Sequence, residues 1–534
     1  MRHHGYYSRT TYGSGFYREL APDWLDFAAL IQSHQSPRHD SHQFRYLELG
    51  SGMGFGLCQL AAVYPEGQFV GVDFNPSHIA QSQTLAKRLG LSNITFVDGD
   101  FVDLANSITS CAAPPIQANS FHYVAAHGIY TWVVDQVRDA LLELASRALR
   151  AGGIFYCSYN CYPGWLGRSV FQKLLQHEQR RSDPTADKAC FQTTIRTCHH
   201  LLGTAESPSP LGASLPFLRN ELDHLDLRNL NYLNGEYSNA GWAPVYSADI
   251  HSHCAEHRLT FLSSASLPDC FAELLASSLK ELVLQEKNPI LRQLLIDLAT
   301  NKSFRRDVFV KGANTLSQAQ TANQLGQIGF LPLQQKSPPE ERAEQDPPSA
   351  YVFMTSFGQV IGDPGVYAPI AKQLANAQGC TMAQLQNSAG ASAEELPIIT
   401  SLFLDAGRIT FDRSELGMAA IPSAQHANQC VLELIQMGRD HSTLILPLAG
   451  TSVEISLVEV LILQAHIQGL EGHMLASCVN LGLEALGAKL LDEGLSPIAK
   501  MKDVLEKITA AADDFLNYRL PMMRRLGAFP DEWF

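Results

Sequence analysis

The sequence predicts an α/β fold in which a Rossmann-like, doubly wound parallel sheet is followed by mostly helical domains. Strand-like and helix-like segments alternate between residues 44 and about 158, which is the order of a parallel sheet with crossover helices. The first predicted strand runs into a loop with glycines at positions 50, 52 and 54, and the second ends in Asp73. These observations together predict a sheet that binds a cofactor.

The elements of this sheet are bounded by local signals. Pro76 opens a helix at a first-turn position, Gly90 ends it, and glycines at 152 and 153 separate the third helix from the last strand. The predicted strands cover residues 46–49, 68–73, 94–97, 121–125 and 154–159, and the predicted helices cover 56–64, 76–89 and 135–149. In such sheets the ligand lies outside the carboxyl ends of the strands. One rim should therefore carry Gly50, Asp73, Asp100, His127 and Asn160.

The glycine loop is the most specific motif of the chain. Glycine lets backbone amides and a helix N-terminus approach a ligand that a Cβ would block, and a carboxylate after the next strand suits a ribose diol. A dinucleotide site competes with this interpretation, because it uses G-x-G-x-x-G. Here the last glycine of that pattern would fall at Phe55 or Leu57. The E-x-G-x-G-x-G form, from Glu48 to Gly54, resembles motif I of the class I S-adenosylmethionine-dependent methyltransferases.

Two further segments carry a narrower resemblance. They read Phe121-His-Tyr-Val-Ala-Ala-His-Gly-Ile-Tyr-Thr-Trp-Val133 and Cys157-Ser-Tyr-Asn-Cys-Tyr-Pro-Gly-Trp165. They resemble signatures of methyltransferases with a regulatory domain, including the rickettsial protein lysine methyltransferases. Segments around Pro22-Asp-Trp-Leu25, Glu236-Tyr237 and Trp242-Ala-Pro-Val-Tyr246 extend the similarity over most of the chain. The chain departs from the family pattern at Ser51, where Cys is common, and at Gly235, where His is usual.

The resemblance implies a set of functional residues and S-adenosylmethionine as the cofactor. The implied cofactor-binding residues are Tyr12, Glu48, Gly50, Ser51, Gly52, Gly54, Asp73, Phe74, Asp100, Phe101 and His127. Aromatic faces after the fourth and fifth strands suit a methylammonium or a sulfonium through cation–π attraction, although Trp132 and Trp165 suit domain packing equally well. The predicted catalytic residues are His127, Tyr130, Trp132, Tyr159, Asn160 and Trp165. For His127 two roles stay open, a general base or a hydrogen-bonding post.

The remainder of the chain predicts several modules. Three helices and a strand between 369 and 411 follow a winged-helix-like order, but residues 361–413 hold five acidic against three basic residues, which disfavours DNA. The segment 336–350 is polar and proline-rich, as expected of a linker. The predicted domains are an N-terminal aromatic and helical cap (1–43), the cofactor-binding catalytic domain (44–200), the regulatory domain (201–335), the linker (336–350), the winged-helix-like domain (351–420) and a C-terminal helical domain (421–534).

Composition restricts the possible partners. The net charge of −14 over 534 residues argues against general binding to nucleic acid. No segment has the apolar run of a membrane span, and the start of the chain lacks the apolar core of a secretion signal, so a cytoplasmic location is expected. The histidines at 251, 253 and 257, with Cys254, have helical spacing suited to metal ligands, but ordinary helix packing explains them and no metal is predicted.

The function predicted by the resemblance is methyl transfer from S-adenosylmethionine to lysine side chains of a protein, by an enzyme that forms a homodimer. Two alternatives stay open. One is a small-molecule N- or O-methyltransferase, because the aromatic rim does not distinguish a lysine from a small amine or hydroxyl. The other is a non-catalytic binding protein that uses the cofactor fold for assembly.

Overall fold

The computed structural model describes residues 2–3, 6–7, 15–108, 116–183, 185–227, 229–239, 241–333, 351–376, 378–389, 391–439, 441–492 and 497–534. The side chains of 2, 3, 6, 7, 388 and 389 are not among the described parts. The predicted linker at 336–350 and the predicted site residue Tyr12 lie outside these residues. Among the described residues, no helix is both long enough and apolar enough to span a bilayer.

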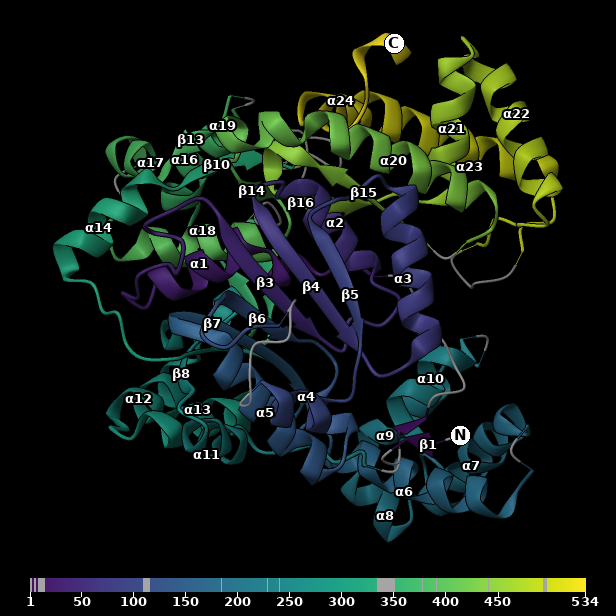
Figure 1. Ribbon diagram of the computed structural model, residues 1–534. Helices are drawn as coiled ribbons and strands as arrows, with labels where there is room; N and C mark the ends of the chain where they lie inside the picture. The colour runs from purple at the N-terminus through teal and green to yellow at the C-terminus, as the bar shows by residue number, and fades with distance from the viewer. Residues whose placement is uncertain are drawn as a thin grey trace.

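A seven-stranded mixed sheet forms the centre of the molecule (Figure 1). Its strand order is β5-β4-β3-β6-β7-β9-β8, with β3 to β7 parallel and β9 antiparallel to both β7 and β8. The strands are β3 (Phe44–Leu49), β4 (Gly67–Asp73), β5 (Ile94–Asp98), β6 (Phe121–Ala126), β7 (Leu149–Asn160), β8 (Thr260–Ser264) and β9 (Phe304–Val310). The predicted Rossmann-like sheet is confirmed, and its five predicted strands are β3 to β7.

The two faces of the sheet bury alternate residues of each strand. Tyr46, Phe69 and Tyr123 pack on one face, whereas Leu47 and Val70 pack on the other. This alternation follows from the two-residue period of a strand. The first face is covered by α1 (Pro22–Leu30), α2 (Phe55–Val63) and α3 (Pro76–Arg88), and the second by α4 (Phe101–Ser107), α5 (Asp135–Ala148) and α11 (Ser247–Glu256).

The last two strands, β8 and β9, come from a region whose sequence predicts mostly helices. Between β7 and β8 the chain inserts a run of helices, most of which lie together at one end of the sheet (Figure 1). The predicted boundary between the catalytic and regulatory domains, at residues 200 and 201, therefore falls between β7 and β8, which both belong to the central sheet. The helices of this stretch are α6 (Leu166–Arg181), α7 (Asp187–Leu202), α8 (Pro210–Ser214), α9 (Pro216–Asp223), α10 (Leu230–Tyr237) and α11; α12 (Ser277–Gln285) and α13 (Pro289–Thr300) separate β8 from β9.

A buried ionic cluster holds β9 in place. Arg305 pairs with Asp297 of α13 at 2.5 Å and with Asp307 at 3.0 Å, and His251 of α11 contacts Asp307 at 2.8 Å. All four side chains are almost fully buried. Removing one partner of such a group leaves an uncompensated buried charge, which costs about 3–5 kcal/mol. The cluster thus ties the inserted helices to the sheet.

A smaller three-stranded sheet and several helices follow. β10 (Gly329–Pro332) pairs antiparallel with β13 (Cys380–Thr381) and β14 (Ile409–Phe411), and the hairpin β11 (Val352–Thr355) and β12 (Gly358–Ile361) precedes the helices. The three predicted helices are present as α16 (Pro364–Leu374), α17 (Met382–Ala389) and α18 (Glu395–Asp405). Because β10 comes from before the predicted linker, the module begins earlier than residue 351. Its winged-helix character stays a prediction.

The C-terminal part packs against α2, which covers the first face of the central sheet, and lies along the upper side of Figure 1. It is helical as predicted, with the addition of one hairpin, β15 (Thr443–Leu446) and β16 (Thr451–Glu454). Arg413 fixes its position, because the buried guanidinium pairs with Asp23 and Glu66 and donates to the carbonyl of Val63 at 3.0 Å. The helices are α19 (Ser414–Gly417), α20 (Ile421–Gln436), α21 (Leu457–Ile467), α22 (Gly472–Ala485), α23 (Met501–Asp514) and α24 (Leu520–Arg525).

Short elements complete the description. The N-terminal end carries a two-residue pair, β1 (Arg2–His3) and β2 (Tyr6–Tyr7), and short 3₁₀ turns connect many of the larger elements. Within the described residues these turns are Arg18–Leu20, Tyr130–Trp132, Leu267–Cys270, Ala272–Leu274, Met418–Ala420, Pro447–Ala449 and Asp531–Trp533, and a π-helical turn spans Phe515–Arg519.

Candidate functional site

The glycine loop after β3 opens a space beside the start of α2. Gly50, Gly52 and Gly54 all have a positive φ, at 81°, 53° and 72°. This backbone conformation is strained for any residue with a side chain. A Cβ on Gly52 would meet nothing within 4 Å, whereas one on Gly54 would lie 2.6 Å from the ring of Phe96. Gly54 is therefore required by the packing of the loop, and Gly52 leaves an opening on its ligand side.

Asp73 ends β4 directly beside this loop. One oxygen of its carboxylate accepts the amide of Gly52 at 3.0 Å, and the other accepts the amide of Asn75 at 2.9 Å. His78 lies 3.2 Å from the same carboxylate. Each carboxylate oxygen has two lone pairs, so these contacts orient the group and leave acceptor capacity for a ligand hydroxyl.

Two polar groups of the β3 end face the same space. Burial and the nearby carboxylate of Asp73 raise the pKa of Glu48 to about 8. The hydroxyl oxygen of Ser51 is buried without a hydrogen-bond partner among the described residues. Buried polar atoms are nearly always paired in folded proteins, so an unpaired hydroxyl beside an open loop suits a bound ligand.

The end of β5 adds a third side to the space. Asp100 caps α4 by accepting the amide of Val102 at 2.8 Å, and Phe101 follows it as the first residue of that helix. Phe74 lies after β4 on the same rim. This arrangement combines an acidic cap with two aromatic rings.

These groups line one cavity of about 810 Å³. The cavity brings together thirteen of the predicted site residues, from five different strand ends. They are Glu48, Gly50, Ser51, Gly52, Gly54, Asp73, Phe74, Asp100, Phe101, His127, Trp132, Asn160 and Trp165. The predicted rim at the carboxyl ends of the parallel strands is thus where the cavity lies.

His127 lines the cavity just after the end of β6. Its Nδ1 atom lies 2.9 Å from the hydroxyl of Tyr156 and 3.2 Å from that of Ser158, and the ring of Tyr17 lies 4.0 Å from its ring centroid. Burial and the positive charge of Arg306 lower the pKa of His127 to about 3. A histidine with that pKa is neutral at neutral pH and takes up protons poorly. Of its two predicted roles, the geometry favours the hydrogen-bonding post.

Asn160 and Glu236 form a polar pair in the cavity lining. Asn160, at the end of β7, donates its backbone N–H to the hydroxyl oxygen of Thr131 at 3.1 Å, and its side-chain amide donates to Glu236 of α10 at 2.7 Å. Burial raises the pKa of Glu236. Trp165 and Tyr232 line the cavity beside this pair. This end of the cavity therefore joins an acid with a raised pKa to two aromatic rings.

Two of the predicted aromatic residues lie elsewhere, which corrects their expected position. Tyr159 is fully buried on the opposite face of β7, where its hydroxyl donates to Asp307. The cause is strand alternation, since Asn160 faces the cavity and its neighbour must face away. The ring of Tyr130 is likewise buried, and its hydroxyl lies 2.8 Å from Nδ1 of His253. Neither residue lines the cavity.

Other lining residues were not among the predicted site residues. Tyr17 comes from the N-terminal segment, Tyr232 and Glu236 from α10, and Arg168 from α6. Phe304 and Arg306 come from β9. The available signal was the likeness of Glu236-Tyr237 to a regulatory-domain motif, which marked the segment without giving Glu236 a role.

Comparisons with known proteins agree with this geometry. Residues 40–222 match a methyltransferase domain, and residues 229–311 match a predicted methyltransferase regulatory domain. The chain is a methyltransferase with a methyltransferase regulatory domain. The first match ends and the second begins within the inserted helices. Strands β3 to β7 belong to the methyltransferase segment and β8 and β9 to the regulatory segment, so the two segments share one sheet.

One relative is similar to this methyltransferase over nearly the whole chain, and another over about half of it. The uncharacterized protein sll1526 of Synechocystis is 28% identical over 98% of this chain and 99% of its own. The uncharacterized protein RP789 of Rickettsia prowazekii is 26% identical over 57% of this chain and 52% of its own. Two structures of PKMT2 from Rickettsia typhi, one of them in complex with AdoHcy, share the fold at 14% and 15% identity. Their TM-scores are 0.63 and 0.65, and the matches cover 97% of this chain and 99% of theirs.

S-adenosylmethionine is the cofactor of this methyltransferase, and the cavity fits it. The open side of Gly52 and the unpaired hydroxyl of Ser51 lie where a ligand would approach the loop. A carboxylate at the end of β4 suits a ribose diol. Acidic and aromatic groups at the end of β5 suit an adenine, whose amino group donates hydrogen bonds and whose face stacks on rings.

Proposed function

We propose that this methyltransferase transfers a methyl group to the side-chain nitrogen of lysine in a protein substrate. The observation that carries the proposal is the carboxyl group of Glu236, which Asn160 holds in the cavity at 2.7 Å from its amide nitrogen. A carboxylate is the protein group best suited to bind an ammonium ion. It lies at the end of the cavity formed by β7 and α10, apart from the glycine loop.

Within this proposal, the glycine-loop end of the cavity holds the cofactor. Glu48 and the backbone from 50 to 54 take the methionine part, Asp73 takes the ribose hydroxyls, and Asp100 with Phe101 takes the adenine. When bound, S-adenosylmethionine supplies an electrophilic methyl group on a sulfonium. His127, Tyr17 and Trp132 would then separate the cofactor end from the acceptor end and exclude water from it.

The acceptor lysine must lose a proton before its nitrogen can take a methyl group, because an ammonium has no lone pair. Its reference pKa is about 10.4, and a buried site lowers it. Glu236 is the group placed to receive this proton, because its pKa is raised by burial and a raised pKa makes a carboxylate a stronger base. His127 is a weaker candidate, since a pKa of about 3 makes its imidazole a weak base.

The walls around Glu236 suit a long aliphatic side chain that ends in a cation. Trp165 and Tyr232 provide ring surfaces for the methylene groups and for cation–π attraction. Arg168 also lines this end, and its guanidinium forms a two-bond pair with Glu221 at 2.6 and 3.0 Å. This pairing offsets a positive charge that would otherwise repel a lysine.

The choice of a protein acceptor is supported by similarity. Residues 121–133 and 157–165 resemble the signatures of rickettsial protein lysine methyltransferases. PKMT2 of Rickettsia typhi has a similar fold over nearly the whole chain.

The test is transfer of radiolabelled methyl groups from S-adenosylmethionine into fractionated cell lysate. Label in protein, recovered as methyl-lysine after hydrolysis, is the expected result. Glu236→Gln keeps a similar shape and should lower the transfer rate by about 10²- to 10⁴-fold, which is the range for removing a general base. Its Kd for S-adenosylhomocysteine should not change.

The matched control is Glu433→Gln, an exposed glutamate paired with Arg88 at 2.9 Å on the outer surface. It should transfer label at the wild-type rate. Label found only in small molecules would exclude the lysine acceptor and leave the cofactor assignment intact. Equal rates for Glu236→Gln and wild type would exclude Glu236 as the proton acceptor.

A further inference from the structure

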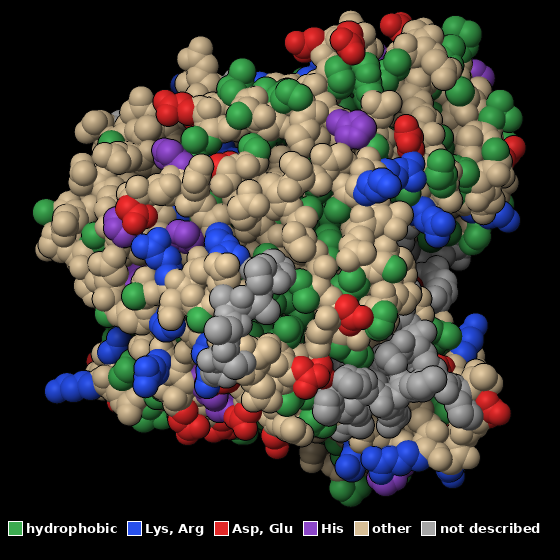
Figure 2. Space-filling view, viewed as in Figure 1, with side chains coloured by type: hydrophobic (Ala, Val, Ile, Leu, Met, Phe, Trp, Pro, Cys, Tyr) green, Lys and Arg blue, Asp and Glu red, His purple; other side chains and the backbone are tan. Residues whose placement is uncertain are grey.

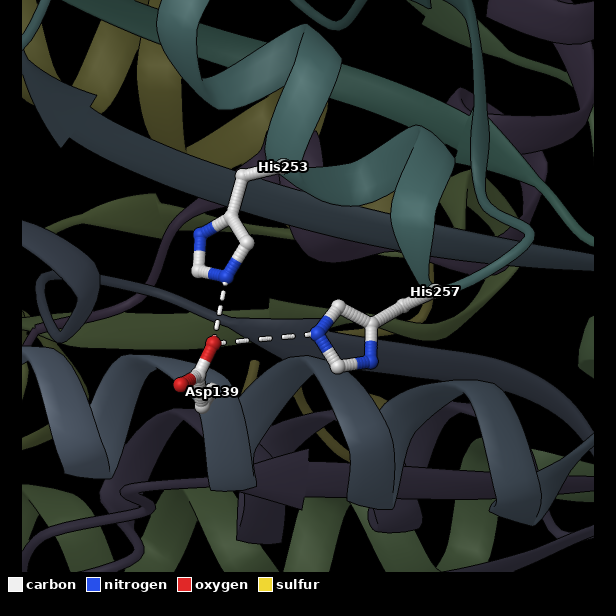
Figure 3. Close-up of side chains that lie close together, drawn as sticks. All are labelled: Asp139, His253 and His257. Carbon is white, nitrogen blue, oxygen red and sulfur yellow. Dashed lines mark hydrogen bonds and ion pairs between the residues drawn. The ribbon is translucent and has the colours of Figure 1, made fainter.

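Three potential metal ligands meet on the outer side of α5, away from the cofactor cavity. Nε2 of His253 lies 2.6 Å from Oδ1 of Asp139, and Nε2 of His257 lies 3.9 Å from the same oxygen (Figure 3). One ligand atom from each residue lies within 4.8 Å of the other two. Asp139 belongs to α5, and the two histidines come from the last turn of α11 and its C-cap. The sequence showed the two histidines but could not place Asp139 beside them.

The separations suit a tetrahedral transition-metal ion. Zinc binds histidine nitrogen and carboxylate oxygen at about 2.0–2.2 Å, so tetrahedral ligand atoms lie roughly 3.3 Å apart. The distances of 2.6 and 3.9 Å bracket this value. Because one ligand atom of each residue already lies within 4.8 Å of the other two, small side-chain rotations would bring the three atoms toward this spacing. Two imidazoles favour zinc, nickel or copper over magnesium and calcium, which prefer oxygen ligands.

The outer nitrogen of each histidine is already oriented by a second group. Nδ1 of His253 lies 2.8 Å from the hydroxyl of Tyr130, and Nδ1 of His257 lies 3.1 Å from the carboxylate of Glu143. Metal-binding histidines almost always use their other ring nitrogen in this way, which fixes the tautomer and the ring plane. The hydrogen bonds to Tyr130 and Glu143 thus match the pattern of metal-binding histidines.

The cluster is also open to water. The side chain of Asp139 is 66% exposed, and those of His253 and His257 are 23% and 18% exposed. Figure 2 shows acidic side chains beside a histidine at the lower edge of the visible face, over the region of α5 and α11. A metal there could complete its coordination with solvent. His251 and Cys254, by contrast, are buried, and His251 contacts Asp307.

We propose that Asp139, His253 and His257 bind one divalent transition-metal ion, with Zn²⁺ as the ion that the ligand set fits best. The site joins α5 of the methyltransferase domain to α11 of the regulatory segment. It also fixes Tyr130, which lies two residues before the cavity residue Trp132. Metal binding would thus hold the regulatory segment against the wall of the catalytic cavity.

The experiment uses the full chain after removal of metals with a chelator. Zn²⁺ affinity is measured in competition with a chromophoric chelator, and Co²⁺ is added as a spectroscopic probe of coordination. We expect one tight Zn²⁺ per chain and a Co²⁺ absorption typical of four-coordinate geometry. Asp139→Ala, His253→Ala and His257→Ala should each lower the affinity by about 100-fold, and Glu143→Gln by about 10-fold, as found for residues that orient metal ligands.

Two further variants keep the result interpretable. Asp139→Asn changes an exposed side chain to one of the same shape, so it retains the fold if an alanine variant does not, and it should still weaken Zn²⁺ binding. His199→Ala is the matched control, because His199 pairs with Asp223 at 3.2 Å with no second histidine within that pair. It should bind Zn²⁺ as the wild type does. Unchanged binding in Asp139→Asn and His253→Ala, or equal loss in His199→Ala, would overturn the proposal.

Discussion

Replacing Gly52 by alanine should separate cofactor binding from stability. The backbone there has φ 53°, and an added Cβ would meet no protein atom within 4 Å. The conformation itself costs about 1–2 kcal/mol for a residue with a Cβ. The new methyl group would project into the cavity, where it must compete with bound cofactor. Forcing a methyl group into a packed contact costs about 1–3 kcal/mol. At 1.4 kcal/mol per factor of ten, the Kd for S-adenosylhomocysteine should rise about 5- to 140-fold.

The matched control for this change is Gly469→Ala. Gly469 also has a positive φ, 76°, and no atom within 4 Å of the added Cβ, but it lies after α21, outside the cavity. Thermal unfolding should show similar decreases in Tm for both variants. Calorimetric titration should show a higher Kd for S-adenosylhomocysteine only in Gly52→Ala. An unchanged Kd in Gly52→Ala would refute the inference that the cofactor occupies the space beside this glycine.

Three other predictions follow from buried groups. Because burial and Asp73 raise the pKa of Glu48 to about 8, a cationic ligand must displace a proton at pH 7. The affinity for S-adenosylmethionine should therefore increase as pH rises from 6 to 9, and a Glu48→Gln titration with the same slope would contradict this. Tyr159→Phe removes a hydrogen bond to the buried carboxylate of Asp307 and should cost about 1.5–3 kcal/mol of stability with no change in cofactor Kd. A large loss of cofactor affinity in Tyr159→Phe would show that Tyr159 does contribute to the cofactor site. Arg413→Met removes the arginine from the carboxylate of Glu66 and one of two arginines from that of Asp23, which keeps Arg38. It should cost about 3–5 kcal/mol and speed limited proteolysis between the catalytic and C-terminal parts. An unchanged digestion pattern would show that Arg413 does not hold the two parts together.

The first five strands of the sheet could be predicted because their signals are local. Each is a short apolar run with glycine, proline or an acid at its end. β8 and β9 lack that signal. β9 reads Phe-Arg-Arg-Asp-Val-Phe-Val, and its charged residues suggest a surface segment. Arg305 and Asp307 are buried only because Asp297 and His251 reach them from two helices. Such partners cannot be recognised before the chain is folded.

The same distinction applies to the cavity. Residues at strand ends were found because the carboxyl ends of parallel strands meet at one edge. Tyr159 was predicted to line the cavity, but it faces the other side of the sheet. Successive residues of a strand face opposite sides, and its neighbour Asn160 faces the cavity. Tyr17, Glu236 and Arg306 reach the cavity from the N-terminal segment, an inserted helix and β9. Their presence there depends on tertiary packing, and no spacing in the sequence encodes it.

The return of the chain to its sheet affects how this protein is synthesised. β7 ends at Asn160, but its neighbour β9 ends at Val310, about 150 residues later. A ribosome adds about 5–20 residues per second, so the edge of β7 stays unpaired for roughly 8 to 30 s, until β9 has been synthesised. Unpaired strand edges of this kind invite association with other chains. Nascent chains of this length should therefore depend on chaperones, and a fragment that stops before residue 310 should aggregate, however complete its cofactor motifs are.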